Sequence, residues 1–270
     1  MAALVFRLRA APPERLDLSA LTPAGLVGLD RAAIAALVVG TTKHAPTVGD
    51  LFEVSGDDPG EIVFEGGSDR LDRIGAGLTG SARITVVGDA GLDVGAGMKG
   101  GAIRVTGSAL HRAGAGMTGG LLTIGGDAGD FTGGTAASGA MAGQAGGIIV
   151  VSGRVGDRAG DRMRRGLLVA IAGTGAHAGA RMSGGTIVTA ELGAEPGTLM
   201  KRGTLVAGRH GDLGPTFVPA GRYELPFLRL LARHIATTVP VAAGLIPERA
   251  LRWRGDMAAL GKGEILVAAG

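Results

Sequence analysis

The stretch GAGMKGGAIRVTG at residues 95–107 returns 19 residues later as GAGMTGGLLTIGG at residues 114–126. Pairs of small or aliphatic residues recur at nearly this interval: Ile84/Val86, Ile103/Val105, Leu122/Ile124, Ile149/Val151, Leu168/Ala170, Ile187/Thr189 and Leu205/Ala207. A constant period of this length is typical of a solenoid, in which each repeat buries its apolar face against its neighbours. We therefore predict an all-β solenoid with one repeat about every 19 residues.

Each repeat has the pattern of a strand with one buried face, because aliphatic and polar residues alternate, as in Ile103-Arg104-Val105-Thr106. Methionines form a second column of equivalent positions, with Leu78 in the first place and Met141 near the irregular repeat: Met98, Met117, Met163, Met182 and Met200. We interpret this column as core packing rather than as thioether ligands of a metal or heme, because methionine commonly fills irregular gaps in cores.

Composition narrows the class of protein. None of the 270 residues is cysteine, which excludes disulfides, thiolate metal sites and iron–sulfur clusters in this chain. The first residues lack the pattern of a secretory signal, and no apolar run approaches the roughly 20 residues of a membrane helix, so we expect a cytoplasmic protein without membrane contact. The formal net charge is +3, but Trp253 and Tyr223 stand alone. Nucleic-acid binders usually combine basic residues with stacking aromatics, so we predict no nucleic-acid partner.

The chain divides into three parts. Residues 1–46 lie outside the repeat and are predicted to form a small α/β module that caps one end of the solenoid. Residues 47–210 carry the repeats, and residues 211–270 are predicted to hold a helix over 225–235 and a closing strand. Between Ile124 and Ile149 the spacing is 27 residues instead of 19, and the extra residues fall within 131–144. This insertion could mark a binding face or reflect a harmless change in length.

A search for chemistry finds no catalytic, cofactor-binding or metal-binding residues. The five histidines, at positions 44, 111, 177, 210 and 234, show no spacing typical of metal ligands. The repeated Gly-x-Gly-x-x-Gly precedes a strand rather than a helix, which is the wrong context for a dinucleotide site. No Gly-x-Ser-x-Gly motif occurs. Asp89, Asp127 and Asp157 follow the strands one per repeat and are interpreted as turn residues that bond their own backbone.

One set of residues remains as a candidate binding site. Lys99, Arg164 and Lys201 occupy equivalent positions just after the column methionines. Neighbouring cations flank them on either side: Arg162, Arg165, Arg181 and Arg202. Stacking of the repeats is expected to place these side chains along one edge, where aligned cations attract anions. The stripe is predicted to contact an acidic partner surface or an anionic ligand tail, although ordinary solvent-exposed turns would show the same residues.

The repeat resembles the Gly-x-Gly-x-Gly repeats shared by the C-subunit of formylmethanofuran dehydrogenase and the C-terminal domain of the glutamate synthase large subunit. The similarity to the C-subunit family is the closer of the two and covers roughly residues 20–267. It rests on GDLFEVSG (49–56), IGAG (74–77), VGAGMKGG (94–101), GDRMRRG (160–166) and the closing segment 252–265. The chain departs from the family pattern in the insertion of residues 131–147 and in lacking Gly-Asp after Ile187.

The resemblance implies a right-handed parallel β-helix without an active centre, which serves as a scaffold for catalytic subunits. The family includes an archaeal tungsten or molybdenum dehydrogenase and a bacterial formyltransferase/hydrolase complex that passes formyl groups from tetrahydromethanopterin to a methanofuran-type carrier and releases formate. The implied partners are an amidohydrolase-like subunit, a formyltransferase subunit and a dehydrogenase-B-like subunit. Because the carriers bear glutamate-rich tails, the resemblance makes Arg164, Arg165, Lys201 and Arg202 candidate contacts for such a tail.

Other interpretations remain open at this stage. Abundant Ala, Gly and Arg with only four lysines indicate a GC-rich genome, which favours the bacterial complex over the archaeal one. A β-helix enzyme such as a polysaccharide lyase or a hexapeptide acyltransferase is a remote alternative, since those lyases use carboxylate clusters on long loops and those acyltransferases repeat every six residues. An independent glutamate-synthase-like domain is the third possibility.

Overall fold

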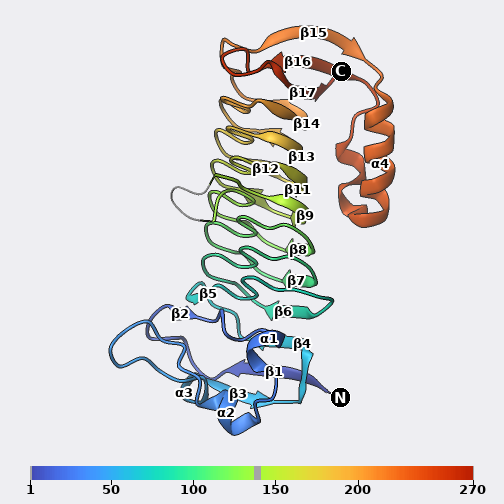
Figure 1. Cartoon of the computed structure of the whole chain (residues 1–270). Helices are drawn as coiled ribbons and strands as arrows, with labels where there is room; N and C mark the ends of the chain where they lie inside the picture. Colours follow the sequence, from blue (N-terminus) through green and yellow to red (C-terminus); the bar gives the residue numbers. More distant parts are fainter. Residues whose placement is uncertain (1, 137–140, 270) are drawn as a thin grey trace.

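The computed structural model describes residues 2–136 and 141–269. The described chain is mostly β, with a 13-stranded sheet, two small two-stranded sheets and a C-terminal helix (Figure 1). The large sheet runs in the order β15-β16-β17-β14-β13-β11-β9-β8-β7-β6-β4-β1-β3. Its strands are β1 (Ala3–Leu8), β3 (Phe52–Ser55), β4 (Asp58–Glu65), β6 (Arg83–Val87), β7 (Ala102–Val105), β8 (Leu121–Ile124), β9 (Ala145–Val151), β11 (Arg165–Ala170), β13 (Ser183–Leu192), β14 (Arg202–His210), β15 (Val218–Tyr223), β16 (Ala250–Gly255) and β17 (Lys262–Ala268).

The central strands of this sheet are parallel and follow one another in chain order. From β4 to β14, each strand pairs with the strand of the next repeat, and β17 adds in parallel to β14. The predicted aliphatic pairs are register partners, as in Ile84 opposite Ile103 and Ile103 opposite Leu122. A second line of parallel contacts joins Ala90, Ala109, Ala128 and Val155 and continues through β10 (Arg154–Val155) and β12 (Gly173–Thr174). Successive repeats therefore meet along two sides.

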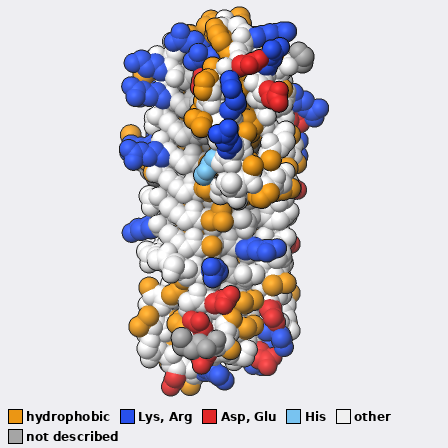
Figure 2. All heavy atoms as spheres, turned by 90° about the vertical axis from the view of Figure 1, so that its right-hand side faces the viewer, with side chains coloured by type: hydrophobic (Ala, Val, Ile, Leu, Met, Phe, Trp, Pro, Cys, Tyr) orange, Lys and Arg blue, Asp and Glu red, His pale blue; other side chains and the backbone are white. Residues whose placement is uncertain are grey.

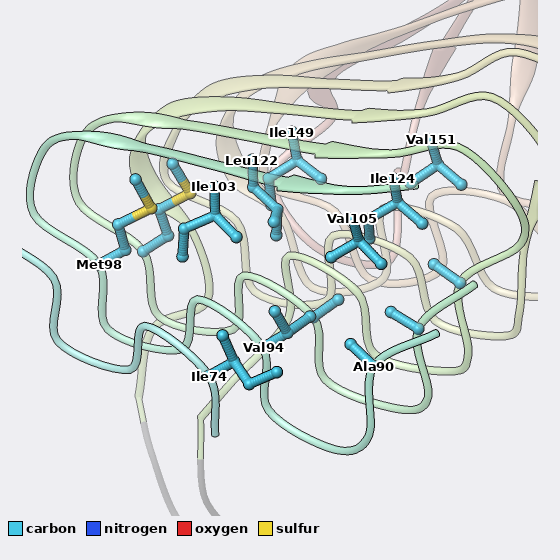
Figure 3. Packing of buried hydrophobic residues seen from close by; sticks show 14 of the residues in the cluster. Ile74, Ala90, Val94, Met98, Ile103, Val105, Leu122, Ile124, Ile149 and Val151 are labelled. Atoms are coloured by element: carbon cyan, nitrogen blue, oxygen red, sulfur yellow. The ribbon is translucent and has the colours of Figure 1, made fainter. Parts of the chain in front are cut away.

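The aliphatic side chains point into the space between these two lines of contacts. Ile103, Leu122 and Ile149 stack above one another, and each is at most 1% exposed. Figure 3 shows them facing Ile74 and Val94 from the opposite side of the repeats. Because a strand of four to six residues buries too little apolar surface to be stable alone, the stacking of neighbours provides the core.

The methionine column is buried as predicted and interlocks with glycines of the next repeat. Met98, Met117, Met163, Met182 and Met200 are all 0% exposed. A Cβ atom at Gly120 would lie 2.5 Å from the Cε atom of Met98, and the same relation joins Met117 to Gly147 at 2.6 Å. Each methionine methyl therefore occupies the space that a larger residue in the following repeat would need.

The irregular repeat fills this column with a polar side chain. Gln144, which is 0% exposed, takes the methionine position, whereas Met141 is 74% exposed. The Gln144 Nε2 donates to the carbonyl oxygens of Gly146, Gly147 and Leu167 at 3.2, 3.0 and 3.3 Å. The methionine position of the irregular repeat therefore holds a buried glutamine, whose Oε1 has no hydrogen-bond partner among the described residues.

The turn aspartates connect repeats rather than closing their own turns. Asp89 Oδ1 accepts from the N–H of Ser108 at 2.7 Å, and Asp127 Oδ1 accepts from the N–H of Arg154 at 2.7 Å. Asp157 makes the same bond to Ala176 at 2.8 Å. The prediction that they bond their own backbone missed these partners, which lie one repeat later. An unpaired backbone N–H is costly, so each carboxylate fixes the neighbouring turn.

The first part of the chain joins the same sheets. β1 pairs in parallel with β4 and antiparallel with β3, and Phe6, Phe52 and Phe64 form an aromatic cluster beneath them. β2 (Leu16–Asp17) pairs with β5 (Leu71–Asp72). Three short helices complete this end: α1 (Pro23–Leu26), α2 (Arg31–Ala35) and α3 (Val48–Leu51).

The C-terminal helix lies along the outer face of the large sheet. α4 (Pro226–Thr238), followed by the 3-10 helix η1 (Pro240–Leu245), buries Leu228, Leu231 and Ile235. It covers outward-facing residues of five strands: Val150, Leu167, Val169, Val188, Val206 and Leu266. The helix predicted over 225–235 is thus confirmed, and it packs beside the C-terminal part of the sheet (Figure 1). Within the described residues, no helix is both long and apolar enough to cross a membrane.

Gly114 tests the packing between repeats. Its φ is +61°, and an added Cβ would lie 2.5 Å from the Cδ1 of Ile149. Gly97 has a similar φ of +65° but open space around the same position. We expect Gly114→Ala to lower the free energy of unfolding by about 2–4 kcal/mol, from backbone strain plus overpacking, and Gly97→Ala by only about 1 kcal/mol from strain. Urea unfolding measures both, and equal losses would contradict the stacking of Ile149 on Gly114.

Candidate anion-binding site

The predicted cations all lie on the turns that lead into the large sheet. The backbone N–H groups of Lys99, Arg164 and Lys201 donate to carbonyls of the preceding repeat: Leu78 at 2.7 Å, Gln144 at 2.8 Å and Met182 at 2.7 Å. The three residues therefore occupy equivalent places, as the sequence predicts. Arg165 and Arg202 follow as the first residues of β11 and β14. All five side chains belong to exposed residues.

Four of the seven predicted cations come together in one groove of about 520 Å³. Arg162, Arg164, Arg181 and Lys201 line it, and the remaining lining residues are Met141, Ser183, Leu199, Ala258 and Ala259. Arg165, Arg202 and Lys99 do not line the groove. Two repeats with uncharged residues, Thr118 and Ala145, stand between Lys99 and Arg164 in the same column. The structure thus gathers Arg162, Arg164, Arg181 and Lys201 in the later repeats, and Lys99 lies apart from them.

Two arginines of the groove hold a backbone conformation that favours glycine. Arg162 and Arg181 both have φ near +55°. The equivalent residues of earlier repeats are Gly97 and Gly116, and in all four the N–H donates to a carbonyl of the following repeat. A left-handed conformation costs a side-chain-bearing residue about 1–2 kcal/mol. Leu199, which precedes Met200 in the next repeat, has the same conformation with φ +58°, so this conformation belongs to the turn.

A buried carboxylate fixes one side of the groove. Asp161 is 1% exposed, and its Oδ1 accepts from Arg181 Nε at 3.0 Å and Nη2 at 2.7 Å. Arg162 Nε lies 3.9 Å from the other oxygen. Arg164 and Lys201 form neither ion pairs nor side-chain hydrogen bonds with the residues that the structure describes. Their charges are thus available to an external anion.

Lys262 adds a cation that the sequence analysis missed. It lies opposite Arg202 across β14 and β17, so two positive residues are direct neighbours in parallel strands. Like charges in this position destabilise a sheet. The sequence feature that could have identified Lys262 is the similarity of Lys262-Gly263 to Arg202-Gly203. This similarity indicates that β17 is one further repeat.

Asp256 joins the two walls of the groove. Its Oδ2 accepts from the N–H of Leu199 at 2.8 Å, and its Oδ1 accepts from the N–H of Ala258 at 2.7 Å. Burial alone would raise the pKa of this carboxyl, but hydrogen bonds from Thr216, Leu199 and Ala258 outweigh it, and the pKa lies below its usual value. The ionised form therefore holds the loop that carries Ala258 and Ala259.

Residues that could supply other chemistry are not grouped in this way. Over residues 2–136 and 141–269, no three His, Asp or Glu side chains are placed to hold a metal ion. His111 lies 3.6 Å from Asp130, and His177 lies 3.7 Å from Glu195, each as an isolated pair between neighbouring repeats. The groove can therefore bind an anion, for which it offers guanidinium and ammonium donors.

No family model matches the chain. A comparison with characterised proteins finds the C-subunit of the formyltransferase/hydrolase complex Fhc of Methylorubrum extorquens, which is 49% identical over 264 residues, or 97% of this chain and 98% of the relative. The chain belongs to the Fhc C-subunit family. Among solved structures it resembles a chain of the FhcABCD complex of M. extorquens, crystallised with methylofuran, with a TM-score of 0.92 and 47% identity over 98% of this chain and 100% of the other. These matches confirm the family resemblance and agree with the preference for the bacterial complex.

Charge in this family member is segregated along the long axis. Residues 1–72 contain six Lys/Arg and 11 Asp/Glu, whereas residues 154–270 contain 16 Lys/Arg and nine Asp/Glu. Figure 2 shows most of the Lys and Arg side chains of one face gathered towards the C-terminal end. The groove lies within this basic part, so the surrounding field adds to its attraction for anions.

Protonation of Asp256 is expected to destabilise the loop that carries Ala258 and Ala259. Because its pKa is lower in the folded than in the unfolded state, where it is about 3.9, its contribution is present above that value and is lost as pH falls through the folded pKa. We expect Asp256→Asn to lower stability at pH 7 and to flatten the dependence of stability on pH below about 4. Urea unfolding between pH 7 and 3 measures this, with the exposed Asp212→Asn as control. Parallel curves for Asp256→Asn and the wild type would contradict the role of the carboxylate.

We expect Arg162 to lower the free energy of unfolding, because its backbone conformation favours glycine. Arg162→Gly relieves the left-handed strain of about 1–2 kcal/mol and adds a chain-entropy cost of about 0.5–1 kcal/mol. We therefore expect a variant more stable than the wild type by about 0.5 kcal/mol. Arg164→Gly, at a position without positive φ, should instead lose stability. Thermal unfolding distinguishes the two, and a loss at both positions would show that Arg162 stabilises the fold.

Proposed function

We propose that this chain is the non-catalytic scaffold subunit of a formyltransferase/hydrolase complex in tetrahydromethanopterin-linked one-carbon metabolism. The observation that carries the proposal is the match over nearly the whole length of both chains to a C-subunit whose complex was crystallised with methylofuran. A relative this similar over its full length supports the same role. It supports that role over the archaeal dehydrogenase, the lyase, the acyltransferase and the glutamate-synthase-like domain.

The architecture suits a scaffold. We interpret the in-register parallel strands and the second line of contacts as a right-handed parallel β-helix over residues 47–210, capped by residues 1–46 and closed by residues 211–270. Such a stack forms a long rod whose sides are available to several partners at once. The partners in this proposal are the amidohydrolase-like, formyltransferase and dehydrogenase-B-like subunits.

The groove gives the scaffold a binding role. Arg164 and Lys201 face outward, and Arg162 and Arg181 stand beside them over the buried Asp161. Arg165, Arg202 and Lys262 extend the positive surface along the strands, and Lys99 lies further away on the same edge. Such donors bind carboxylates and phosphates. The groove therefore suits either the glutamate-rich tail of a methanofuran-type carrier or an acidic face of a neighbouring subunit.

A variant that neutralises two cations of the groove and the two arginines that follow them, called the groove variant, tests this proposal in the assembled complex. The variant carries Arg164→Gln, Arg165→Gln, Lys201→Gln and Arg202→Gln and is purified from its native cells through a tag. We expect the tagged wild type to bring down the amidohydrolase-like and formyltransferase subunits in fixed ratio. The variant should retain carrier or subunits at least tenfold less well at low salt, and the difference should shrink as salt rises, because screening weakens exposed charges.

A matched control separates local from general charge effects. Arg9, Lys43, Arg83 and Arg104 are exposed, form no side-chain ion pairs with the described residues and lie outside the groove. Changing these four to Gln should leave retention of carrier and subunits unchanged. Equal losses in both variants, or none at low salt in the groove variant, would contradict the groove as the anion site. A wild type that purifies without other subunits would contradict the scaffold role.

A further inference from the structure

The outer side of α4 exposes large apolar side chains. Its inner side packs on the sheet through Leu228, Leu231 and Ile235, which are 1%, 8% and 0% exposed. On the outer side, Leu230 is 63% exposed and Phe227 is 38% exposed. Phe227 and Leu230 are three residues apart and share one face of the helix. A helix that served only to cover the sheet would need polar residues at these positions.

An excess of positive charge accompanies these residues. Arg229 and Arg233 are four residues apart, so two like charges are neighbours on the helix, which costs stability. The helix contains no Asp or Glu. Glu224, which precedes the helix, pairs with Arg249 at 2.7 Å and also interacts electrostatically with Arg229. Residues 218–254 contain six arginines and two glutamates, and Figure 2, which faces α4, shows basic and apolar side chains side by side over it.

We propose that the outer face of α4, formed by Arg229, Leu230 and Arg233 with Phe227 at its edge, docks on another subunit, at an apolar hollow bordered by carboxylates. The inference rests on the proposed role in a complex and adds the face and the chemistry of its partner. Leu230 would enter the hollow, and the two arginines would pair with carboxylates at its edge. Central apolar anchors with arginines beside them are the residues that dominate binding energy at protein interfaces.

The charge and shape of the face favour a protein surface over other partners. Nucleic acid offers phosphates, but it offers no apolar hollow for the exposed Leu230. A second copy using the same face would bring Arg229 and Arg233 against themselves. This face is also separate from the groove, because none of its four residues lines it.

Zero-length crosslinking tests the carboxylate border. Arg229→Lys/Arg233→Lys keeps the charge and introduces amines that a carbodiimide couples to carboxylates in direct contact. In the complex purified through the tagged chain, we expect crosslinks from residues 229 and 233 to Asp or Glu of another subunit, identified by mass spectrometry. Arg83→Lys, on the uncovered part of the sheet, is the control. Crosslinks from 229 and 233 confined to this chain would overturn the proposal.

A double substitution tests how much this face of α4 contributes to the affinity for the other subunits. Arg229→Glu/Leu230→Asp should raise the Kd for the other subunits at least tenfold, with the thermal unfolding of the isolated chain unchanged. The control Arg83→Glu/Val87→Asp makes the same kinds of change at exposed positions of β6 and should leave the Kd unaltered. An unchanged Kd for the α4 variant would overturn the docking face while leaving the scaffold role in place. Equal losses in both variants would also overturn it.

Two further measurements test whether this face binds a second copy of the chain or a lipid surface instead. Light scattering of the isolated wild type should show a monomer, and a dimer abolished by the α4 variant would assign the face to a second copy. Sedimentation with vesicles of phosphatidylcholine and phosphatidylglycerol should show no binding that depends on Arg229 and Leu230. Either contrary result would overturn the proposal. A wild type that purifies from its cells alone would overturn both this inference and the scaffold role.

Discussion

The parallel register between successive repeats is the constraint on which the rest of the structure depends. Ile103 stacks on Leu122, and Met98 fits against Gly120, in each case across one repeat boundary. The carboxylate of Asp127 likewise reaches the backbone of the following turn. A slip of one residue would turn the apolar side chains outward and lose these contacts together. The same register places equivalent turns above one another, and so it brings Arg164 and Lys201 onto one edge.

Sequence reasoning predicts well what the period controls. The spacing of Ile84, Ile103 and Leu122 predicts their register, and the methionine column follows from the same count. It fails for residues whose contacts do not follow from the spacing of the repeats. Gln144 takes a methionine position of the irregular repeat and donates to backbone carbonyls there. Lys262 joins Arg202 because β17 returns to the sheet after about 60 residues of unrelated chain. The individual contacts of Arg181 with Asp161 also depend on a turn geometry that spacing does not define.

The outward-facing residues of the repeats indicate which part of the sheet α4 covers. In β7 and β8 the outward residues include Arg104 and Thr123, which suit solvent, but β9 and β11 carry Val150 and Val169 at the equivalent places. Continuous apolar runs, rather than alternating ones, indicate strands covered on both faces. The change from one pattern to the other marks where the helix begins to cover the sheet.

The C-terminal half combines several costs that folding alone does not explain. Arg162 and Arg181 hold strained backbone, Arg202 faces Lys262, and Arg229 neighbours Arg233. Acidic partners would offset the two like-charge contacts, whereas the backbone strain at Arg162 and Arg181 is steric and independent of a partner's charge. If the chain contributes surfaces rather than reacting groups, then formyl transfer and formate release should be absent with the purified chain alone. Both should appear when it is mixed with the other subunits, and omitting it should prevent their assembly. Turnover by the isolated chain, or full activity and assembly without it, would contradict this view.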